Sequence, residues 1–392
     1  MNQKTWRTPI NLLVLMSIAM PVAHATWMVL INNFVVERAA FTGVEIGILQ
    51  SLREVPGFMA FTTVFVLLVL KEQTFACLAL ALLGVGTALT GFFPSEYGLY
   101  FTTVLMSLGF HYFETVKQSL SLQWFSKAEA PRNLGKLIAV GSMASFIIHV
   151  VLWLVLQWLH IDYVPIYLVA GSLVVLLSVF MWAGFPEFPN KEQQVKTLVL
   201  RKRYWLYYAL TFFAGARRQI FIVFASFLMV EKFGYSVANI ALLYLVNYLF
   251  NWIFAERIGS LIGRVGERRA LTFEYIGLIA VFTAYAFVEN PNLAASLFVI
   301  DHMFFALAIA MSTYFQKIAD PKDLASSAGV SFTINHIAAV VIPALLGTVW
   351  IYSITAVFLI GTGMALGSLI LARLVPTNPE TGNEVRFFST TA

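Results

Sequence analysis

Twelve long apolar segments, separated by short polar turns, most constrain the fold of this 392-residue chain. A bilayer core is about 30 Å thick, so a helix needs roughly 20 apolar residues to cross it. Twelve such helices take about 240 residues, which leaves ~150 for helix ends, loops and tails. The sequence therefore predicts an all-α integral membrane protein without a separate soluble domain. The predicted helices span residues 8–34, 43–70, 74–93, 97–125, 134–158, 163–185, 205–230, 236–262, 270–288, 293–317, 324–349 and 352–374.

The amino-acid composition excludes the main alternatives. Hydrophobic residues make up 59% of the chain and charged residues only 11%, against about 25% charged in a typical soluble domain. The 35 phenylalanines exclude a disordered chain. The single cysteine, Cys77, excludes a disulfide framework and a cysteine-based metal cluster. The net charge of +5 does not indicate a nucleic-acid partner, because the placement of basic residues matters more than their sum in a membrane protein.

The placement of lysine and arginine predicts the orientation in the membrane. With the N-terminus inside, the inner loops and tails hold 18 of the 25 basic residues, and the outer loops hold only Arg38 and Lys232. Positive charge concentrates on the cytoplasmic side of membrane proteins. The first apolar segment is too long for a signal peptide and reads as a retained helix. We therefore expect a multi-pass plasma-membrane protein, in the bacterial inner membrane, with both termini cytoplasmic.

The two halves of the chain resemble each other. Shifted by 194 positions, Val-Glu-Arg at 36–38 aligns with Val-Glu-Lys at 230–232. Shifted by 190, Ala-Pro-Arg-Asn-Leu at 130–134 aligns with Asp-Pro-Lys-Asp-Leu at 320–324. Both matches join corresponding turns, which indicates a duplicated six-helix unit. We expect a six-helix bundle at 1–185, a basic cytoplasmic linker at 186–204, a second bundle at 205–375 and a cytoplasmic tail at 376–392.

The loop after the eighth predicted helix, Gly-Ser-Leu-Ile-Gly-Arg-Val-Gly-Glu-Arg-Arg at 259–269, resembles the Gly-x-x-x-Asp-Arg-x-Gly-Arg-Arg signature of the major facilitator superfamily. Gly263 replaces the usual aspartate, and the equivalent loop of the first half is only Lys71-Glu72-Gln73. The resemblance covers the whole chain. It implies a secondary transporter with two pseudo-symmetric bundles around a central cavity, alternating access, and helices 1, 4, 7 and 10 lining the cavity.

Those four helices each carry ionisable residues near their midpoints. A charge at this depth costs about 2.5–3.5 kcal/mol on insertion scales, so it is usually paired or faces water. On helix 4, Glu114 and Lys117 can also form a purely structural pair. Arg217 and Arg218 are adjacent and point about 100° apart, so the sequence leaves open which one faces the cavity. The expected substrate-binding residues are His24, His111, Tyr112, Lys117, Arg217, Arg218 and His302, and the expected proton carriers are Glu114 and Asp301.

Five further residues are expected to act in gating rather than in binding. Arg53 and Glu54 in the second helix form a gate or inter-helix pair. Gly259, Arg264 and Arg268 belong to the loop signature, where the basic residues either steady the interface between the halves or simply anchor the inner side.

The surplus of cations among these residues favours a small organic anion as substrate, held by arginine through paired hydrogen bonds. The chain has no phosphate-binding loop motif, so an ion gradient, most simply of protons, must drive transport. No hydrolase or metalloprotease motif is present, and we expect neither an enzyme nor a cofactor or bound metal. The expected partners are the substrate, the coupling ion and the bilayer, with the chain as a monomer. Transition-metal transport, multidrug transport and a non-transporting receptor remain alternatives.

Overall fold

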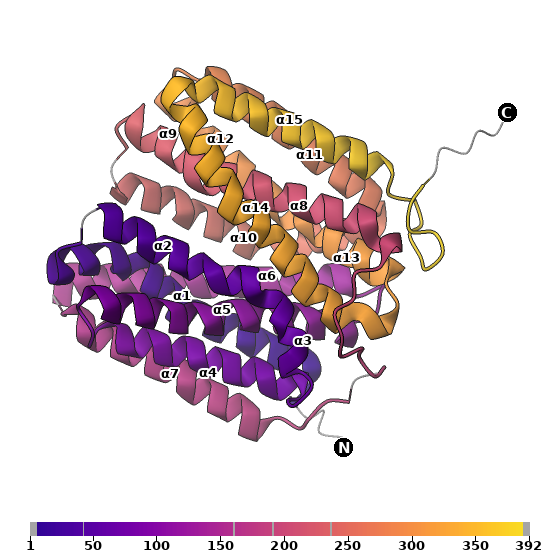
Figure 1. Cartoon of the computed structure of the whole chain (residues 1–392), viewed down its shortest axis with the longest axis horizontal. Helices are drawn as coiled ribbons and strands as arrows, with labels where there is room; N and C mark the ends of the chain where they lie inside the picture. Colours follow the sequence, from indigo (N-terminus) through magenta and orange to yellow (C-terminus); the bar gives the residue numbers. More distant parts are fainter. Residues whose placement is uncertain (1–5, 42, 160, 190–191, 236, 387–392) are drawn as a thin grey trace. The chain divides into compact units, whose positions relative to one another are not determined.

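The computed structural model describes residues 6–386, except 42, 160, 190–191 and 236, and the fold is almost wholly helical (Figure 1). The elements in the first half are α1 (Pro9–Ala39), α2 (Gly43–Phe58), η1 (Met59–Thr62), α3 (Thr63–Val66), α4 (Glu72–Thr90), α5 (Glu96–Trp124), α6 (Ala130–Leu154), η2 (Val155–Leu159) and α7 (Tyr163–Gly184). Those in the second half are η3 (Lys202–Tyr204), α8 (Trp205–Gln219), η4 (Ile220–Ala225), α9 (Ser226–Glu231), α10 (Val237–Val265), α11 (Glu267–Phe287), α12 (Pro291–Phe304), η5 (Phe305–Ala308), α13 (Ile309–Ile318), η6 (Pro321–Asp323), α14 (Leu324–Tyr352) and α15 (Ile354–Arg373).

Where the structure describes the chain, these elements join into twelve long helical segments, as the sequence predicts. Nine of the described helices are long and apolar enough to cross a membrane. The other three segments are α2–α3, α5 and α10. The prediction of an all-α, twelve-helix membrane protein is therefore confirmed.

Local sequence signals explain where several helices begin and end. Thr8 caps α1 by accepting a hydrogen bond from the Asn11 backbone, with proline in the first turn. Asn290 caps α12 in the same manner ahead of another proline. Gly266 has φ +85°, a conformation that favours glycine, and it separates α10 from α11. Helix α1 runs to residue 39 rather than the expected 34 and ends at Ala40 in the left-handed region.

The chain forms two compact units. Unit 1 contains the described residues of Met1–Trp124, Leu137–Leu198 and Ala325–Thr333. Unit 2 contains those of Phe125–Lys136, Val199–Leu324 and Ile334–Ala392. The start of α6 thus belongs to the second unit and the start of α14 to the first. The bundle, linker and tail boundaries expected from the sequence stay predictions.

In unit 1, α4 is the central packing element. It lies against α5 and α7, while α1 packs on α7 and α2 on α5. A Cβ atom on Gly109 of α5 would lie 2.2 Å from the Leu83 backbone nitrogen of α4. Only glycine permits this approach of two helix backbones, so the sequence selects a tight α4–α5 crossing.

Unit 2 repeats this packing scheme with the corresponding helices. Helix α11 lies against α15 and α12, while α8 packs on α15 and α10 on α12. In order along each half, the third segment contacts the fourth and sixth, the first contacts the sixth, and the second contacts the fourth. The same four pairings in both units confirm the pseudo-symmetric bundles that the two sequence offsets predict.

Candidate functional site

Arg217 lies inside unit 2, with only 4% of its surface exposed. Its Nη2 atom is 3.6 Å from Oε1 of Glu274 on α11, and its Nη1 donates a hydrogen bond to the Ser368 hydroxyl on α15. The guanidinium also lies over the Tyr275 ring, 4.4 Å from its centroid. Three neighbours on two other helices therefore fix this side chain in the interior of the unit.

Asp301 completes a buried charge network in the same unit. It is 6% exposed on α12, and it interacts electrostatically with both Arg217 and Glu274. Within the part of the chain that the structure describes, Oδ2 of Asp301 and Oε2 of Glu274 have no hydrogen-bond partner. Arg217 is thus ion-paired with Glu274, and Asp301 is a second buried carboxyl group of the same unit.

The helices that carry these residues lose regular α-geometry just beyond them. A π-helical stretch, Ile220–Ala225, begins two residues after Arg218. A 3₁₀ stretch, Phe305–Ala308, follows Asp301 by one turn. Such interruptions frequently mark functional positions and hinges in otherwise regular helices. The hydrophobic pattern of the sequence is continuous here and gave no sign of either break.

Arg218 and His302 occupy different surroundings from their neighbours in sequence. Arg218 is one residue beyond Arg217, about 100° further around α8, and is half-buried. His302 is also half-buried and stacks against Phe305 at a centroid distance of 5.5 Å. The structure therefore separates the two adjacent arginines into an interior residue and a partly exposed one, which the sequence could not do.

In unit 1, the acidic and basic residues of α5 pair with each other. Lys117 Nζ lies 2.5 Å from Glu114 Oε1, and both side chains are mostly buried. The structural pairing that the sequence left open is thus present. Lys117 is therefore not a surplus cation, whereas the proton-carrying role of Glu114 stays a prediction.

The expected histidines and tyrosine of unit 1 are held mainly by ring contacts and hydroxyls. His111 is buried, with Nδ1 2.9 Å from the Ser107 hydroxyl and 3.0 Å from the Ser107 carbonyl oxygen. His24 stacks on Phe110 at 4.1 Å. Tyr112 shares a hydrogen bond with the Thr62 hydroxyl. A substrate-binding role for these three residues stays a prediction.

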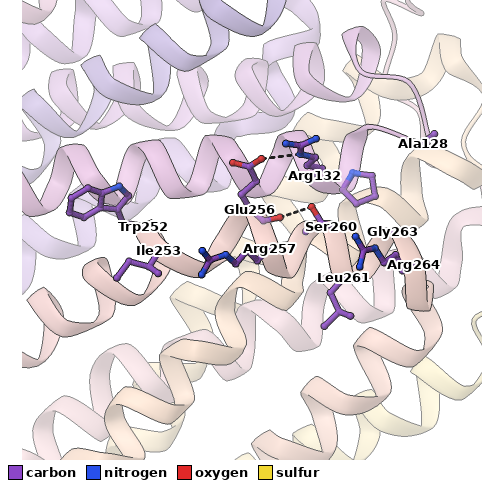
Figure 2. A pocket seen from close by; sticks show the side chains of 12 residues that line it. Ala128, Arg132, Trp252, Ile253, Glu256, Arg257, Ser260, Leu261, Gly263 and Arg264 are labelled. Atoms are coloured by element: carbon purple, nitrogen blue, oxygen red, sulfur yellow. Dashed lines mark hydrogen bonds and ion pairs between the residues drawn. The ribbon is translucent and has the colours of Figure 1, made fainter.

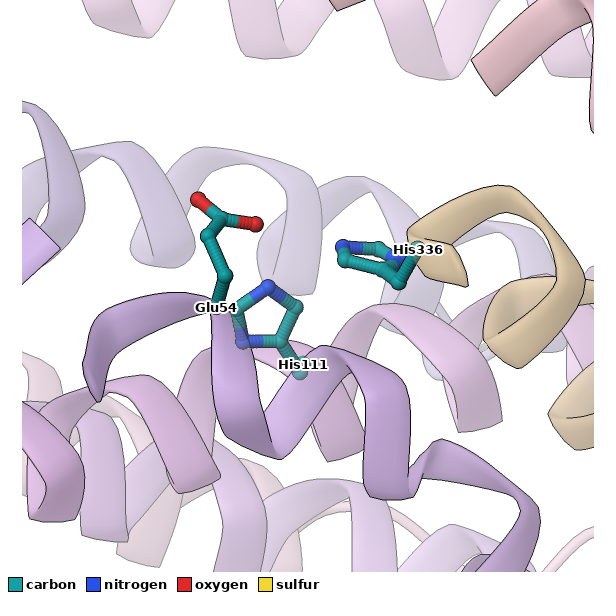
Figure 3. Close-up of side chains that lie close together, drawn as sticks. All are labelled: Glu54, His111 and His336. Carbon is teal, nitrogen blue, oxygen red and sulfur yellow. The ribbon is translucent and has the colours of Figure 1, made fainter. Parts of the chain in front are cut away.

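The expected gate residues of α2 lie close to His111. Arg53 Nη2 is 2.7 Å from Glu54 Oε1, a pair within one helix, and the gating role of both residues stays a prediction. The Glu54 carboxylate and a ring nitrogen of His111 lie within 4.8 Å of each other (Figure 3). His336, drawn in the same view, belongs to unit 2 and is buried there.

The loop signature lies where α10 meets the start of α6. A Cβ atom on Gly259 would lie 2.1 Å from the Pro131 carbonyl oxygen, so the two helix backbones touch. Arg264 is exposed, and Arg268 Nη1 lies 3.5 Å from the Thr377 hydroxyl. The buried Glu267 pairs with Lys317 at 2.6 Å. The signature therefore combines a close helix crossing with buried and exposed charges.

The family model described as "Major Facilitator Superfamily" matches residues 12–343 and 209–389, which together cover nearly the whole chain. The chain belongs to the Major Facilitator Superfamily. Members of this superfamily are transporters rather than enzymes, so the chain is a multi-pass membrane protein of the secondary-transporter class.

Solved structures of this superfamily agree with that assignment. The transporter FucP in its outward conformation matches with a TM-score of 0.77 and 14% identity, covering 94% of this chain and 99% of FucP. The human organic anion transporter MFSD10 (TETRAN) matches with a TM-score of 0.78 and 12% identity, covering 94% and 100%. A variant of the E. coli fucose:proton symporter FucP matches at 0.73 and 14%, covering 93% and 98%. No curated protein sequence matches the chain.

Sequence reasoning did not place three of these network residues, Glu274, Tyr275 and Ser368, in the site. Glu274 lies on α11, outside the four helices that the family resemblance places around the cavity. A carboxyl group in an apolar helix is costly unless it is paired. That cost is the signal that could have identified Glu274 as the partner of a buried arginine.

Proposed function

We propose that this transporter moves a small organic anion by alternating access, coupled to protons. We also propose that Arg217 and Arg218 have different roles, one in proton coupling and the other in substrate binding. The observation that carries the proposal is the buried ion pair of Arg217 with Glu274, beside Asp301. It supports a proton-carrying role for the two carboxyl groups with Arg217 as their charge partner, because such a network is neutral only when one carboxyl carries a proton. Arg218, half-buried on another face of α8, is then the residue that binds the anionic group of the substrate.

A planar guanidinium suits this role, because it binds a carboxylate through two parallel hydrogen bonds. The two arginines share one helix, and a π-helical stretch begins two residues after Arg218. Anion binding at Arg218 and protonation of Glu274, the carboxyl group paired with Arg217, therefore both act on this part of α8. We propose this segment as the physical link between substrate occupancy and protonation.

The proposed orientation places both termini in the cytoplasm of a bacterial cell, with the inner membrane as the location. The distribution of 18 inner against two outer basic residues supports it. A transporter that takes up an organic anion against the membrane potential needs an accompanying cation. Proton coupling supplies that cation, and the two buried carboxyl groups supply the groups that could carry it.

The test compares exchange with accumulation in proteoliposomes. A thermal-shift screen of the purified protein against carboxylates, phosphorylated metabolites and transition metals first identifies a ligand. Counterflow of that ligand requires binding and exchange but no net proton movement. Arg218→Gln should abolish counterflow, and Arg218→Lys should not restore it, because lysine lacks the planar fork.

Asp301→Asn should retain counterflow and lose gradient-driven accumulation, and Glu114→Gln provides the parallel test in unit 1. Normal exchange by Arg218→Gln would refute the binding assignment. Accumulation by both carboxyl variants would refute the proton assignment. A shift with a metal alone would favour metal transport, a broad response to apolar cations would favour multidrug transport, and ligand binding without flux would identify a receptor.

A further inference from the structure

A surface groove of about 950 Å³ lies in unit 2, between the start of α6 and the second half of α10 (Figure 2). Its walls include three arginines, Arg132, Arg257 and Arg264, and one acidic residue, Glu256. The close contact of Gly259 with Pro131 forms part of the groove, so both helix backbones fix its shape.

The groove carries a surplus of positive charge. Arg132 Nε lies 2.9 Å from Glu256 Oε1, so these two side chains neutralise each other. Arg257 and Arg264 form no ion pair with any residue that the structure describes, and both are exposed. They are seven residues apart on α10, which puts them on one face about 10 Å apart along the helix axis.

Apolar side chains line the same part of the groove. Trp252, Ile253 and Leu261 are 40%, 45% and 51% exposed. Ile253, Arg257, Leu261 and Arg264 follow one another at helical spacing, so the face alternates between apolar and basic side chains. A soluble anion would contact the arginines and leave these apolar groups without a partner, whereas an amphipathic anion would contact both.

We propose that this groove binds an anionic phospholipid. Its phosphodiester lies between Arg257 and Arg264, and its acyl chains extend along Ile253, Leu261 and Trp252. Basic pockets between helices at the cytoplasmic side of membrane proteins bind anionic lipid headgroups. The proposed orientation places Arg264 at that side, next to the anionic leaflet. The lipid site lies outside the charge network of Arg217 and is independent of substrate identity.

The experiment measures lipid binding by the purified full-length protein. Phosphatidylglycerol and phosphatidylcholine are titrated separately into detergent micelles, and bound lipid is counted by native mass spectrometry. Wild-type protein should bind phosphatidylglycerol in preference to phosphatidylcholine. Arg257→Gln and Arg264→Gln should each weaken that binding about fivefold, and the double variant about 25-fold. Lys202→Gln, which removes an exposed basic residue elsewhere in unit 2, should bind like wild type.

Two further measurements separate a lipid site from a folding defect and from a site for small anions. The melting temperature of each variant shows whether it is folded, and the double Arg→Lys variant should recover most of the binding because it keeps both charges. Inorganic phosphate at millimolar concentration should not displace the lipid, since it lacks acyl chains. Equal binding of both lipids, wild-type binding by the double Gln variant, or full displacement by phosphate would each overturn the proposal.

Discussion

Replacing Gly259 by alanine should destabilise unit 2, because the new methyl group has no room. A Cβ atom at this residue would lie 2.1 Å from the Pro131 carbonyl oxygen and 3.0 Å from its carbonyl carbon. A carbon and a carbonyl oxygen normally stay about 3.3 Å apart or more. The obstructing atoms belong to a backbone, and proline restricts φ there, so side-chain rotation cannot relieve the clash.

Helices α6 and α10 must therefore separate locally by about 1 Å to accommodate the methyl group. Overpacking of this kind costs about 1–3 kcal/mol. Alanine recovers up to about 1 kcal/mol because it favours a helix more than glycine does. Separation also disturbs the neighbouring contact, where a Cβ on Gly135 would lie 2.3 Å from the Ala255 carbonyl oxygen. We expect a net loss of about 1–2 kcal/mol.

Gly263→Ala is the matched control, one turn further along α10. Its new methyl group would have the Pro131 ring carbons at 3.7 Å as nearest neighbours, which is an ordinary contact. The measurement is the melting temperature in detergent, with unfolding monitored by tryptophan fluorescence. Gly259→Ala should melt below wild type and Gly263→Ala at or above it, with a gap of roughly 3–8 °C. Equal melting temperatures for the two variants would refute the close α6–α10 contact.

Three other outcomes test the charge assignments and the orientation. Glu274→Gln should lower stability by about 3 kcal/mol, because it leaves the buried guanidinium of Arg217 with a weaker partner, and a thermal melt measures the loss. Asp323→Asn should cost about 2 kcal/mol, since Asp323 is buried and accepts two hydrogen bonds from Arg201. Those bonds raise the pKa of Arg201 above its ordinary value, so the arginine keeps its charge and the difference in melting temperature should be equal at pH 7 and pH 9. A reporter fused at Lys232 should lie outside the cell, and a cytoplasmic reading would contradict the proposed orientation.

The sequence alone determined the architecture of this transporter. Membrane thickness sets the length of an apolar helix, so hydropathy reveals twelve segments without knowledge of their packing. Proline, asparagine and glycine act on the backbone within a few residues, which explains why breaks such as Asn290 and Gly266 were readable. The two offset matches identified the duplicated bundle, and the loop signature at 259–269 identified the family. Both are patterns of neighbouring residues, so they too can be recognised without knowledge of the packing.

Only the tertiary structure decided which ionisable residues meet. Arg217 and Arg218 are equivalent to any local rule, yet one is buried against Glu274, 57 positions away along the chain, and the other is partly exposed. The tertiary structure alone also brings residues near Arg132 together with residues near Arg257 to form the groove. Such contacts depend on how helix faces rotate against one another, and close packing fixes that rotation through many small contacts that no single stretch of sequence contains.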